Sequence, residues 1–241
     1  QLASLFSLAG ILTYCIGRRL GTKQKWTGRA LQISSLLLWL PLAVLSKENG
    51  ILLPPLLLCI EFFIFRFRGD PDTRRWLFAY FLASCVLPGL AAILWLAFHP
   101  KMFLAGYDLR DFSLGQRLLT EPRVLADYVR QFFLPQGSRM GLYQDDFPIS
   151  NSLLKPPTTL HAILALIASI VASFRAVAPA TRALAFGWIF FLTGHLLEST
   201  IFSLEIYFEH RNYLPAVGLA TGAVLALDRG LHTPRKRLGT L

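Results

Sequence analysis

Long apolar runs separated by short basic segments make up most of this chain. About seven of them approach the roughly 20 residues that a membrane-spanning helix needs. They are Leu2–Ile16, Leu31–Ser46, Ile51–Phe65, Trp76–Phe98, Leu160–Phe174, Ala183–Leu197 and Tyr213–Leu227. The pattern predicts an all-α membrane protein, a polytopic bundle of about seven transmembrane helices that forms a single unit over residues 1–241.

The second and third runs are separated only by Lys47-Glu48-Asn49-Gly50. As one helix, residues 31–65 would be about 52 Å long, far beyond a hydrocarbon core of about 30 Å. A hairpin with this polar tip at the membrane surface is therefore predicted. Glu61 lies inside the second arm, and we expect it to pair with Arg66 or to snorkel toward water.

The longest polar segment, residues 99–158, is predicted to be an extracytoplasmic loop. Within it, Thr120-Glu121-Pro122 resembles a helix start, and apolar residues recur behind it at three-to-four spacing. We expect an amphipathic helix from this point. It can lie along the outer membrane surface or pack beneath a loop, and the sequence does not separate these two arrangements.

Charge and cysteine positions agree with a membrane protein. Hydrophobic residues make up 54 % of the chain and charged residues 16 %, with a formal net charge of +10. Most of that charge lies in the short segments between apolar runs, which places those segments in the cytoplasm and argues against a nucleic-acid partner. Cys15, Cys59 and Cys85 all lie in apolar runs, so we expect core residues and no disulfide framework or metal site.

The stretch Glu198–Pro215 is unusually polar for a segment between two apolar runs. Ionisable groups at a membrane edge are costly, so their density predicts a polar site. Ordinary ion pairs in a hydrated loop are the alternative. The predicted topology also brings Lys47-Glu48 and the Asp145-Asp146 loop to the same side, and three polar clusters can therefore converge in one extracytoplasmic cleft.

Two pairs of side chains in this region have helical spacing. Glu205 and Glu209 are four residues apart, and His195 and Glu198 are three apart, so each pair would share a face on a helical turn. A metal site would need three or four converging ligands, and a divalent metal is not expected. A polar cluster that orients His210 and Arg211 toward an anion is the favoured interpretation.

Arginine and lysine suit phosphate oxygens, and a phosphate at the outer membrane surface points to a membrane lipid, here a polyprenyl-phosphate carrier. We expect Lys47, His210 and Arg211 to bind the donor phosphate. A carboxylate would accept the proton of the attacking hydroxyl. The candidate bases are Asp145, Asp146 and Glu48, and the expected site-orienting residues are His195, Glu198, Glu205, Glu209, Tyr143 and Tyr213.

Two motifs carry a family resemblance. LSKENGILLP (Leu45–Pro54) and LLESTIFSLEIYFEHRNYLP (Leu196–Pro215) resemble segments of the transmembrane and tetratricopeptide-repeat O-mannosyltransferases, which belong to the GT-C class of glycosyltransferases. The bacterial type IV pilin glycosyltransferases are similar. Asn49 replaces the Gln of the eukaryotic SKE-Q-G motif. In the E-R-x-x-Y-x-P motif, His210 stands at the family's Arg and Arg211 is displaced by one position.

The resemblance implies a GT-C fold, a polyprenyl-phosphate-linked sugar as donor, no cofactor, and transfer to a protein or glycan acceptor on the extracytoplasmic face. In a bacterium this would be the periplasmic face of the inner membrane. GT-C enzymes resemble one another in a catalytic Asp just after the first membrane helix. We therefore expect at least one outward span ahead of Gln1, which would make this chain the C-terminal portion of a larger enzyme.

Two alternatives to such a transferase remain open. An O-antigen ligase or polymerase-like enzyme also uses a large outer loop with Arg and His. A non-catalytic transporter or assembly subunit would bind a lipid phosphate without transferring a sugar.

Overall fold

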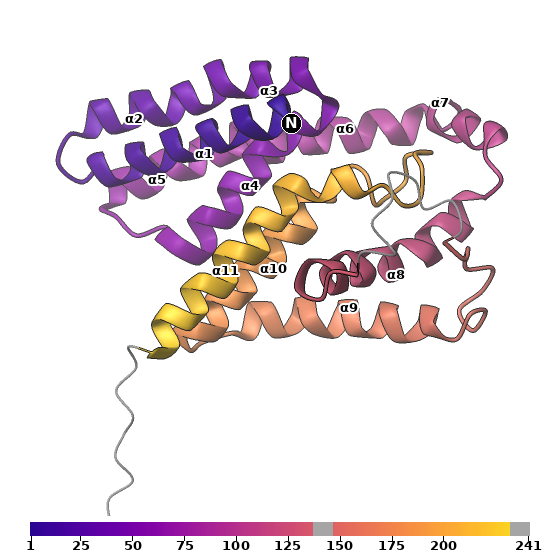
Figure 1. Cartoon of the computed structure of the whole chain (residues 1–241). Helices are drawn as coiled ribbons and strands as arrows, with labels where there is room; N and C mark the ends of the chain where they lie inside the picture. Colours follow the sequence, from indigo (N-terminus) through magenta and orange to yellow (C-terminus); the bar gives the residue numbers. More distant parts are fainter. Residues whose placement is uncertain (137–146, 232–241) are drawn as a thin grey trace, which may run out of the picture.

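The computed structural model (Figure 1) describes residues 1–136 and 147–231 as an all-helical bundle, with no β-strand in these ranges. Its α-helices are α1 (Leu2–Leu20), α2 (Lys25–Ser34), α3 (Leu40–Ser46), α4 (Leu53–Ile60), α5 (Pro71–Phe81), α6 (Leu87–Phe98), α7 (Pro100–Leu104), α8 (Leu114–Phe133), α9 (Thr158–Arg175), α10 (Pro179–Gly194) and α11 (Tyr213–Leu231). Short π segments are η1 (Ser35–Trp39), η3 (Glu61–Phe65) and η4 (Leu82–Val86), and 3-10 segments are η2 (Glu48–Leu52), η5 (Ala105–Leu109) and η7 (Glu209–Asn212).

Helix α1 packs against α2, α3 and α4, and α10 connects this group to α9 and α11. In Figure 1, α4, α10 and α11 cross beneath the layer that contains α1, α2 and α3. The π segments continue the helices on either side of them, so that α2 to α3 and α5 to α6 each form one long helix.

Five helices in the described part of the chain are long and apolar enough to cross a membrane, which is consistent with an integral membrane protein. They are Lys25–Ser46, Glu48–Phe65, Pro71–Phe98, Thr158–Arg175 and His210–Leu231. The other two predicted spans also fold as helices, α1 and α10. They fall outside this set because α1 ends in two arginines and α10 has only 16 residues, about 24 Å at about 1.5 Å per residue.

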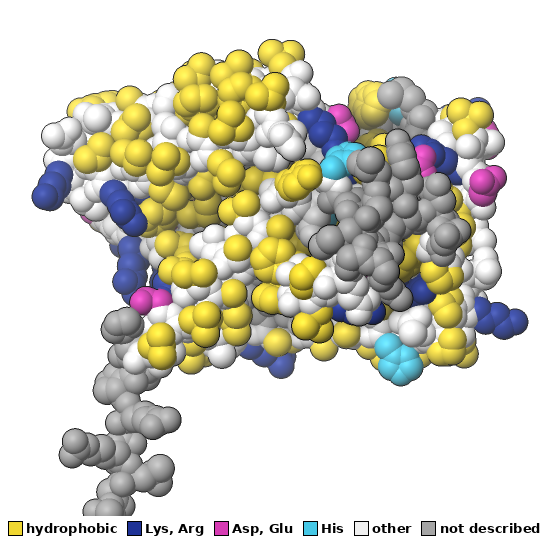
Figure 2. Space-filling view, in the orientation of Figure 1, with side chains coloured by type: hydrophobic (Ala, Val, Ile, Leu, Met, Phe, Trp, Pro, Cys, Tyr) yellow, Lys and Arg dark blue, Asp and Glu magenta, His cyan; other side chains and the backbone are white. Residues whose placement is uncertain are grey.

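Large apolar side chains cover much of the exterior, as the hydrophobic surface in Figure 2 shows. Helix α6 is the extreme case. It has no buried residue, and Leu90, Ile93 and Phe98 are among its exposed apolar side chains. A helix that is apolar on all sides and unburied in the protein matches a lipid environment.

The predicted hairpin is confirmed. Helix α3 ends at Ser46, Lys47 is extended at φ −166° and ψ 145°, and η2 begins the return arm at Glu48. The two arms touch at Gly50, where an added Cβ would lie 2.3 Å from the carbonyl carbon of Ala43. Only glycine lets the backbones approach this closely, so Gly50 fixes where Lys47 emerges.

The helix predicted to start at Thr120 begins six residues earlier. Ser113 caps α8 because its Oγ accepts the Gln116 N–H at 3.2 Å, while the Gln116 side chain accepts the Ser113 N–H at 2.8 Å. Pro122 therefore lies inside the helix. The predicted start was wrong because it relied on Pro122 as a first-turn residue and overlooked the capping box formed by Ser113 and Gln116. The apolar face of α8, with Val124 and Leu125, packs against α9, α10 and α11, which favours the packed arrangement over the membrane surface.

Helices α10 and α11 cross at a glycine contact. A Cβ at Gly222 would lie 2.7 Å from the Gly187 Cα, and one at Gly187 would lie 2.7 Å from the Gly218 carbonyl oxygen. Small residues spaced four apart let two helix backbones approach, which is the usual way that helices associate inside a membrane. This contact holds the two helices between which the polar stretch 195–212 runs.

A buried ion pair joins α1 to η3 at the opposite end of the bundle from Lys47. Arg18 donates to both Glu61 oxygens, at 2.7 and 2.8 Å, and the Tyr14 hydroxyl donates to the same carboxylate at 2.7 Å. Glu61 is fully buried, so snorkelling is excluded. The expected pairing with Arg66 was wrong, because Arg66 takes a left-handed backbone conformation at the end of η3 and only its N–H bonds Glu61, at the backbone carbonyl.

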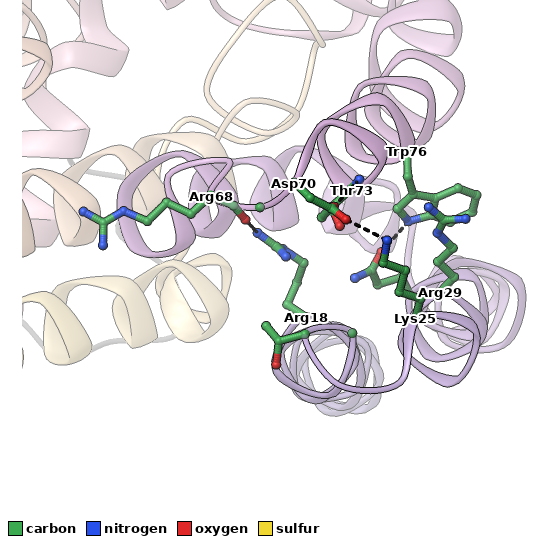
Figure 3. Close-up of a pocket in the computed structure, with 11 residues that line it drawn as sticks. Arg18, Lys25, Arg29, Arg68, Asp70, Thr73 and Trp76 are labelled. Atoms are coloured by element: carbon green, nitrogen blue, oxygen red, sulfur yellow. Dashed lines mark hydrogen bonds and ion pairs between the residues drawn. The ribbon is translucent and has the colours of Figure 1, made fainter.

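The same end holds a basic cavity of about 260 Å³ (Figure 3). We call this end of the bundle the arginine end, after the cavity-lining residues Arg18, Arg29 and Arg68. Lys25 of α2 lies 2.6 Å from Asp70, the cap of α5. Arg29 lies 2.8 Å from Asp72. These exposed pairs close the turn between α4 and α5 onto α2, and each contributes little on its own.

We predict that Arg18→Met lowers stability by about 3–5 kcal/mol, because it leaves the Glu61 carboxylate buried without its cation. Unfolding of the detergent-solubilised protein, followed by circular dichroism, measures the loss. Arg18→Met combined with Glu61→Gln should recover most of it. Arg19→Met, an exposed neighbour on the same helix, serves as control, and an equal loss from both single variants would contradict the buried pair.

Candidate functional site

The polar stretch between α10 and α11 folds around one buried guanidinium. Residues 195–208 form turns and extended chain instead of a helix. Arg117 of α8 is fully buried and donates to the backbone carbonyls of Glu198, Thr200 and Leu204. A planar fork of donors can satisfy several carbonyls at once, so Arg117 takes the place of the hydrogen bonds that a regular element would supply.

Arg117 has a carboxylate partner on its own helix. Glu121 lies 2.9 Å from the guanidinium, and both side chains are nearly inaccessible to solvent. Burial raises the pKa of Glu121 to about 7, against the opposing effect of Arg117. The pair therefore buries a titratable carboxyl beside a permanent cation, next to the stretch that Arg117 holds.

Glu198 is the point at which the two motif regions meet. Lys47 Nζ lies 2.8 Å from one Glu198 oxygen, and Arg211 Nε lies 3.7 Å from the other. The carboxylate is 1 % exposed, while the Lys47 side chain is 33 % exposed. One buried anion thus connects cations that are far apart in sequence, and the predicted convergence of the hairpin tip with the polar stretch is confirmed for these residues.

A cavity of about 250 Å³ opens beside this ion pair. Lys47, His210, Arg211 and Tyr213 line it together with Asn49 and with Ser4 and Ser7 of α1. Glu198 is buried and does not line the cavity, although both of its cations do. In Figure 2, basic, acidic and histidine side chains gather on the surface where the hairpin tip approaches the start of α11.

His210 and Arg211, which were both predicted to contact the donor phosphate, differ in how deeply they are buried. The Arg211 side chain is 9 % exposed, donates to the Glu205 carbonyl and lies over the Phe208 ring at 5.5 Å. His210 is exposed and packs edge-on against the same ring at 4.0 Å. An imidazole has an ordinary pKa of about 6.5, whereas a guanidinium stays protonated throughout the accessible pH range. Arg211 is therefore the permanent charge of the two.

His195 lies outside the cavity, in the core. Its ring is 2 % exposed and stacks on Tyr128 at 5.2 Å between centroids. The Tyr128 hydroxyl in turn accepts the Phe208 N–H at 2.8 Å and donates to its carbonyl at 3.0 Å. His195 thus helps to fix the segment leading into η7.

Other predicted site residues lie elsewhere. Glu205 and Glu209 do not share a helical turn, because Glu205 lies in irregular chain and Glu209 begins η7. The Glu205 carboxylate instead pairs with Arg110, which also donates to the Ser203 carbonyl at 2.9 Å. Glu48 is exposed at the start of η2 and does not line the cavity.

The candidate residues Tyr143, Asp145 and Asp146 lie outside the described residues. Within residues 1–136 and 147–231, no group of three or more His, Cys, Asp or Glu side chains could hold a metal ion.

Sequence reasoning missed the residues that build the site from behind. Arg117, Glu121 and Tyr128 belong to the amphipathic helix whose start was placed too late. The sequence does contain features that identify them. Arg117 and Glu121 have the i, i+4 spacing of an ion pair on a helix, and the capping box of Ser113 and Gln116 marks the start of that helix. Ser4 and Ser7 could not be found from sequence, because only packing brings α1 beside Lys47.

No protein-family model, curated protein or solved structure matches this chain.

We predict that Arg117→Met releases the stretch 198–205 and destabilises the protein by about 3–5 kcal/mol, since it leaves Glu121 uncompensated and several carbonyls unsatisfied. Limited proteolysis of the purified protein should show new cleavage in this stretch. Arg123→Met, on the same helix but bonded to Pro148 and Ser150 instead, is the matched control. Protection of residues 198–205 in both variants would contradict the role of Arg117.

Proposed function

We propose that this protein is an integral-membrane glycosyltransferase that moves a sugar from a polyprenyl-phosphate carrier to a protein or glycan acceptor on the extracytoplasmic face. The observation that carries the proposal is that Lys47, His210 and Arg211, chosen from sequence as phosphate ligands, line one cavity. Cations in a cavity at a membrane surface suit the phosphate of a lipid-linked sugar.

The reaction follows from the charges. The acceptor hydroxyl attacks the anomeric carbon of the sugar, the bond from that carbon to the phosphate oxygen breaks, and the phosphate leaves with the bonding electron pair. Lys47 and Arg211 stabilise the charge that develops on the leaving phosphate, so they favour the transition state over the bound donor. The hydroxyl proton passes to a carboxylate, for which Asp145, Asp146 and Glu48 remain the candidates.

The proposed membrane topology has seven crossings and a GT-C-like fold. Helix α1 contributes Ser4 to the cavity and Arg18 to the arginine end, about 21 Å apart along the helix at about 1.5 Å per residue. The arginine end carries basic residues of two turns, and Arg229, near the end of α11, donates to the Pro179 carbonyl at the start of α10 at 3.2 Å. The positive-inside tendency then places the arginine end in the cytoplasm and the cavity outside, in a bacterium on the periplasmic side of the inner membrane.

We predict that Lys47→Ala and Arg211→Ala each lower transfer from a polyprenyl-phosphate-linked sugar by at least about 100-fold, the usual effect of losing one preorganised transition-state contact. Radiolabelled sugar transfer in proteoliposomes measures the rate. Lys101→Ala, an exposed cation on α7, should leave transfer unchanged. Full activity in both cavity variants would remove this site from the reaction.

Donor preference separates the remaining possibilities. A single-sugar lipid should be used in preference to a lipid-linked oligosaccharide, whereas the reverse preference would indicate a ligase or polymerase-like enzyme. Tight binding of the lipid phosphate, weakened by Lys47→Ala but without transfer to any acceptor, would indicate a binding subunit.

A further inference from the structure

The cations of the cavity already have an anionic partner. Glu198 is 1 % exposed, contacts Lys47 at 2.8 Å and Arg211 at 3.7 Å, and does not itself line the cavity. A carboxylate buried at such a site is costly unless it is paired, and here each oxygen has its own cation. Lys47 and Arg211 supply two positive charges and Glu198 one negative charge, so the group presents a net charge of +1 to the cavity.

Neighbouring charges leave this balance in place. At pH 8 an imidazole with its ordinary pKa of about 6.5 is neutral, so His210 adds little charge. Glu121 lies close enough to act on Glu198 and Arg211, but it is paired with Arg117 at 2.9 Å. The charge that a ligand meets in the cavity is therefore set chiefly by Lys47, Arg211 and the carboxylate behind them.

We propose that Glu198 keeps the cavity from binding a phosphate monoester more tightly than a phosphodiester. This inference rests on the proposed function. The donor is a phosphodiester with one negative charge, which a net charge of +1 matches. The carrier left after transfer is a phosphate monoester, whose second ionisation has a pKa of about 6, so it carries nearly two negative charges at pH 8.

The consequence is a site that does not hold its product more tightly than its donor. If Lys47 and Arg211 faced the cavity without Glu198, the second charge of the monoester would gain a full attraction at short range in a partly desolvated site. The spent carrier would then occupy the site and slow the next cycle. Glu198 weakens that extra attraction. It also weakens, to a smaller extent, the stabilisation that Lys47 and Arg211 give to the charge developing on the leaving phosphate, so the site exchanges part of its transition-state stabilisation for easier release of the spent carrier.

A simpler role is also available to Glu198, since its ion pairs tie the hairpin tip to the stretch after α10. That role predicts a loss of stability and equal weakening of every ligand when the charge is removed. Selectivity predicts a change in the ratio of two affinities, which a loss of structure alone does not produce.

The test uses the full chain in detergent at pH 8 and three short-chain probes: a polyprenyl phosphate monoester, its methyl phosphodiester and the free polyprenol. The wild-type protein should bind both phosphates within about threefold of each other and bind polyprenol much more weakly. In Glu198→Gln, which keeps the side-chain shape, affinity for the monoester relative to the diester should rise by at least about tenfold. Asp108→Asn, an exposed carboxylate on η5, should leave the ratio unchanged.

Each outcome decides a different claim. A wild-type protein that binds the monoester more than about tenfold tighter than the diester overturns the selectivity inference without any variant, and so does a Glu198→Gln protein with an unchanged ratio. The proposed function survives both results if Lys47→Ala still weakens binding of the two phosphates. If neither phosphate binds better than polyprenol, the phosphate site itself fails, and the inference fails with it.

Discussion

The candidate site depends on the hydrogen bonds that the buried Arg117 guanidinium donates to backbone carbonyls. A chain segment without regular secondary structure must satisfy its backbone groups in some other way, and here the carbonyls of Glu198, Thr200 and Leu204 accept from this one side chain. Because the segment is held in place, Glu198 can stay buried and meet Lys47 across the bundle. The positions of the cavity-lining residues therefore depend on α8, although no residue of α8 lines the cavity.

The two ends of the bundle solve the same electrostatic problem differently. At the arginine end, Glu61 is saturated by Arg18 and Tyr14, so the pair is closed and serves to fix α1 against η3. At the other end, Glu198 neutralises only one of its two cations, and both Lys47 and Arg211 also line a cavity. A closed buried pair contributes to structure, whereas an open one leaves charge available to a ligand.

Apolar periodicity and run length predicted the helical class, the hairpin and the positions of the long helices, because these follow from local pattern and membrane thickness. Local pattern failed where partners come from distant segments. The cation for Glu61 was sought at Arg66, nearby in sequence, but the fold supplies Arg18. The helical spacing of Glu205 and Glu209 misled for a similar reason, since the carbonyls of Ser203 and Leu204 bond to Arg110 and Arg117 instead of forming a helix. The sequence predicted only that Lys47 and Glu198 lie on the same side of the membrane. Their direct contact depends on how the helices pack.

Measuring the contact between Lys47 and Glu198 tests the candidate site most directly, because this contact joins the hairpin tip to the polar stretch after α10. A double-mutant cycle with Lys47→Met, Glu198→Gln and the double variant, with unfolding free energies measured by SDS titration of the solubilised protein, isolates the pair. We expect a coupling of about 1–3 kcal/mol, as for residues in direct contact within one network. Additive effects, within about 0.5 kcal/mol, would mean that the two side chains do not meet and would contradict the assembled site.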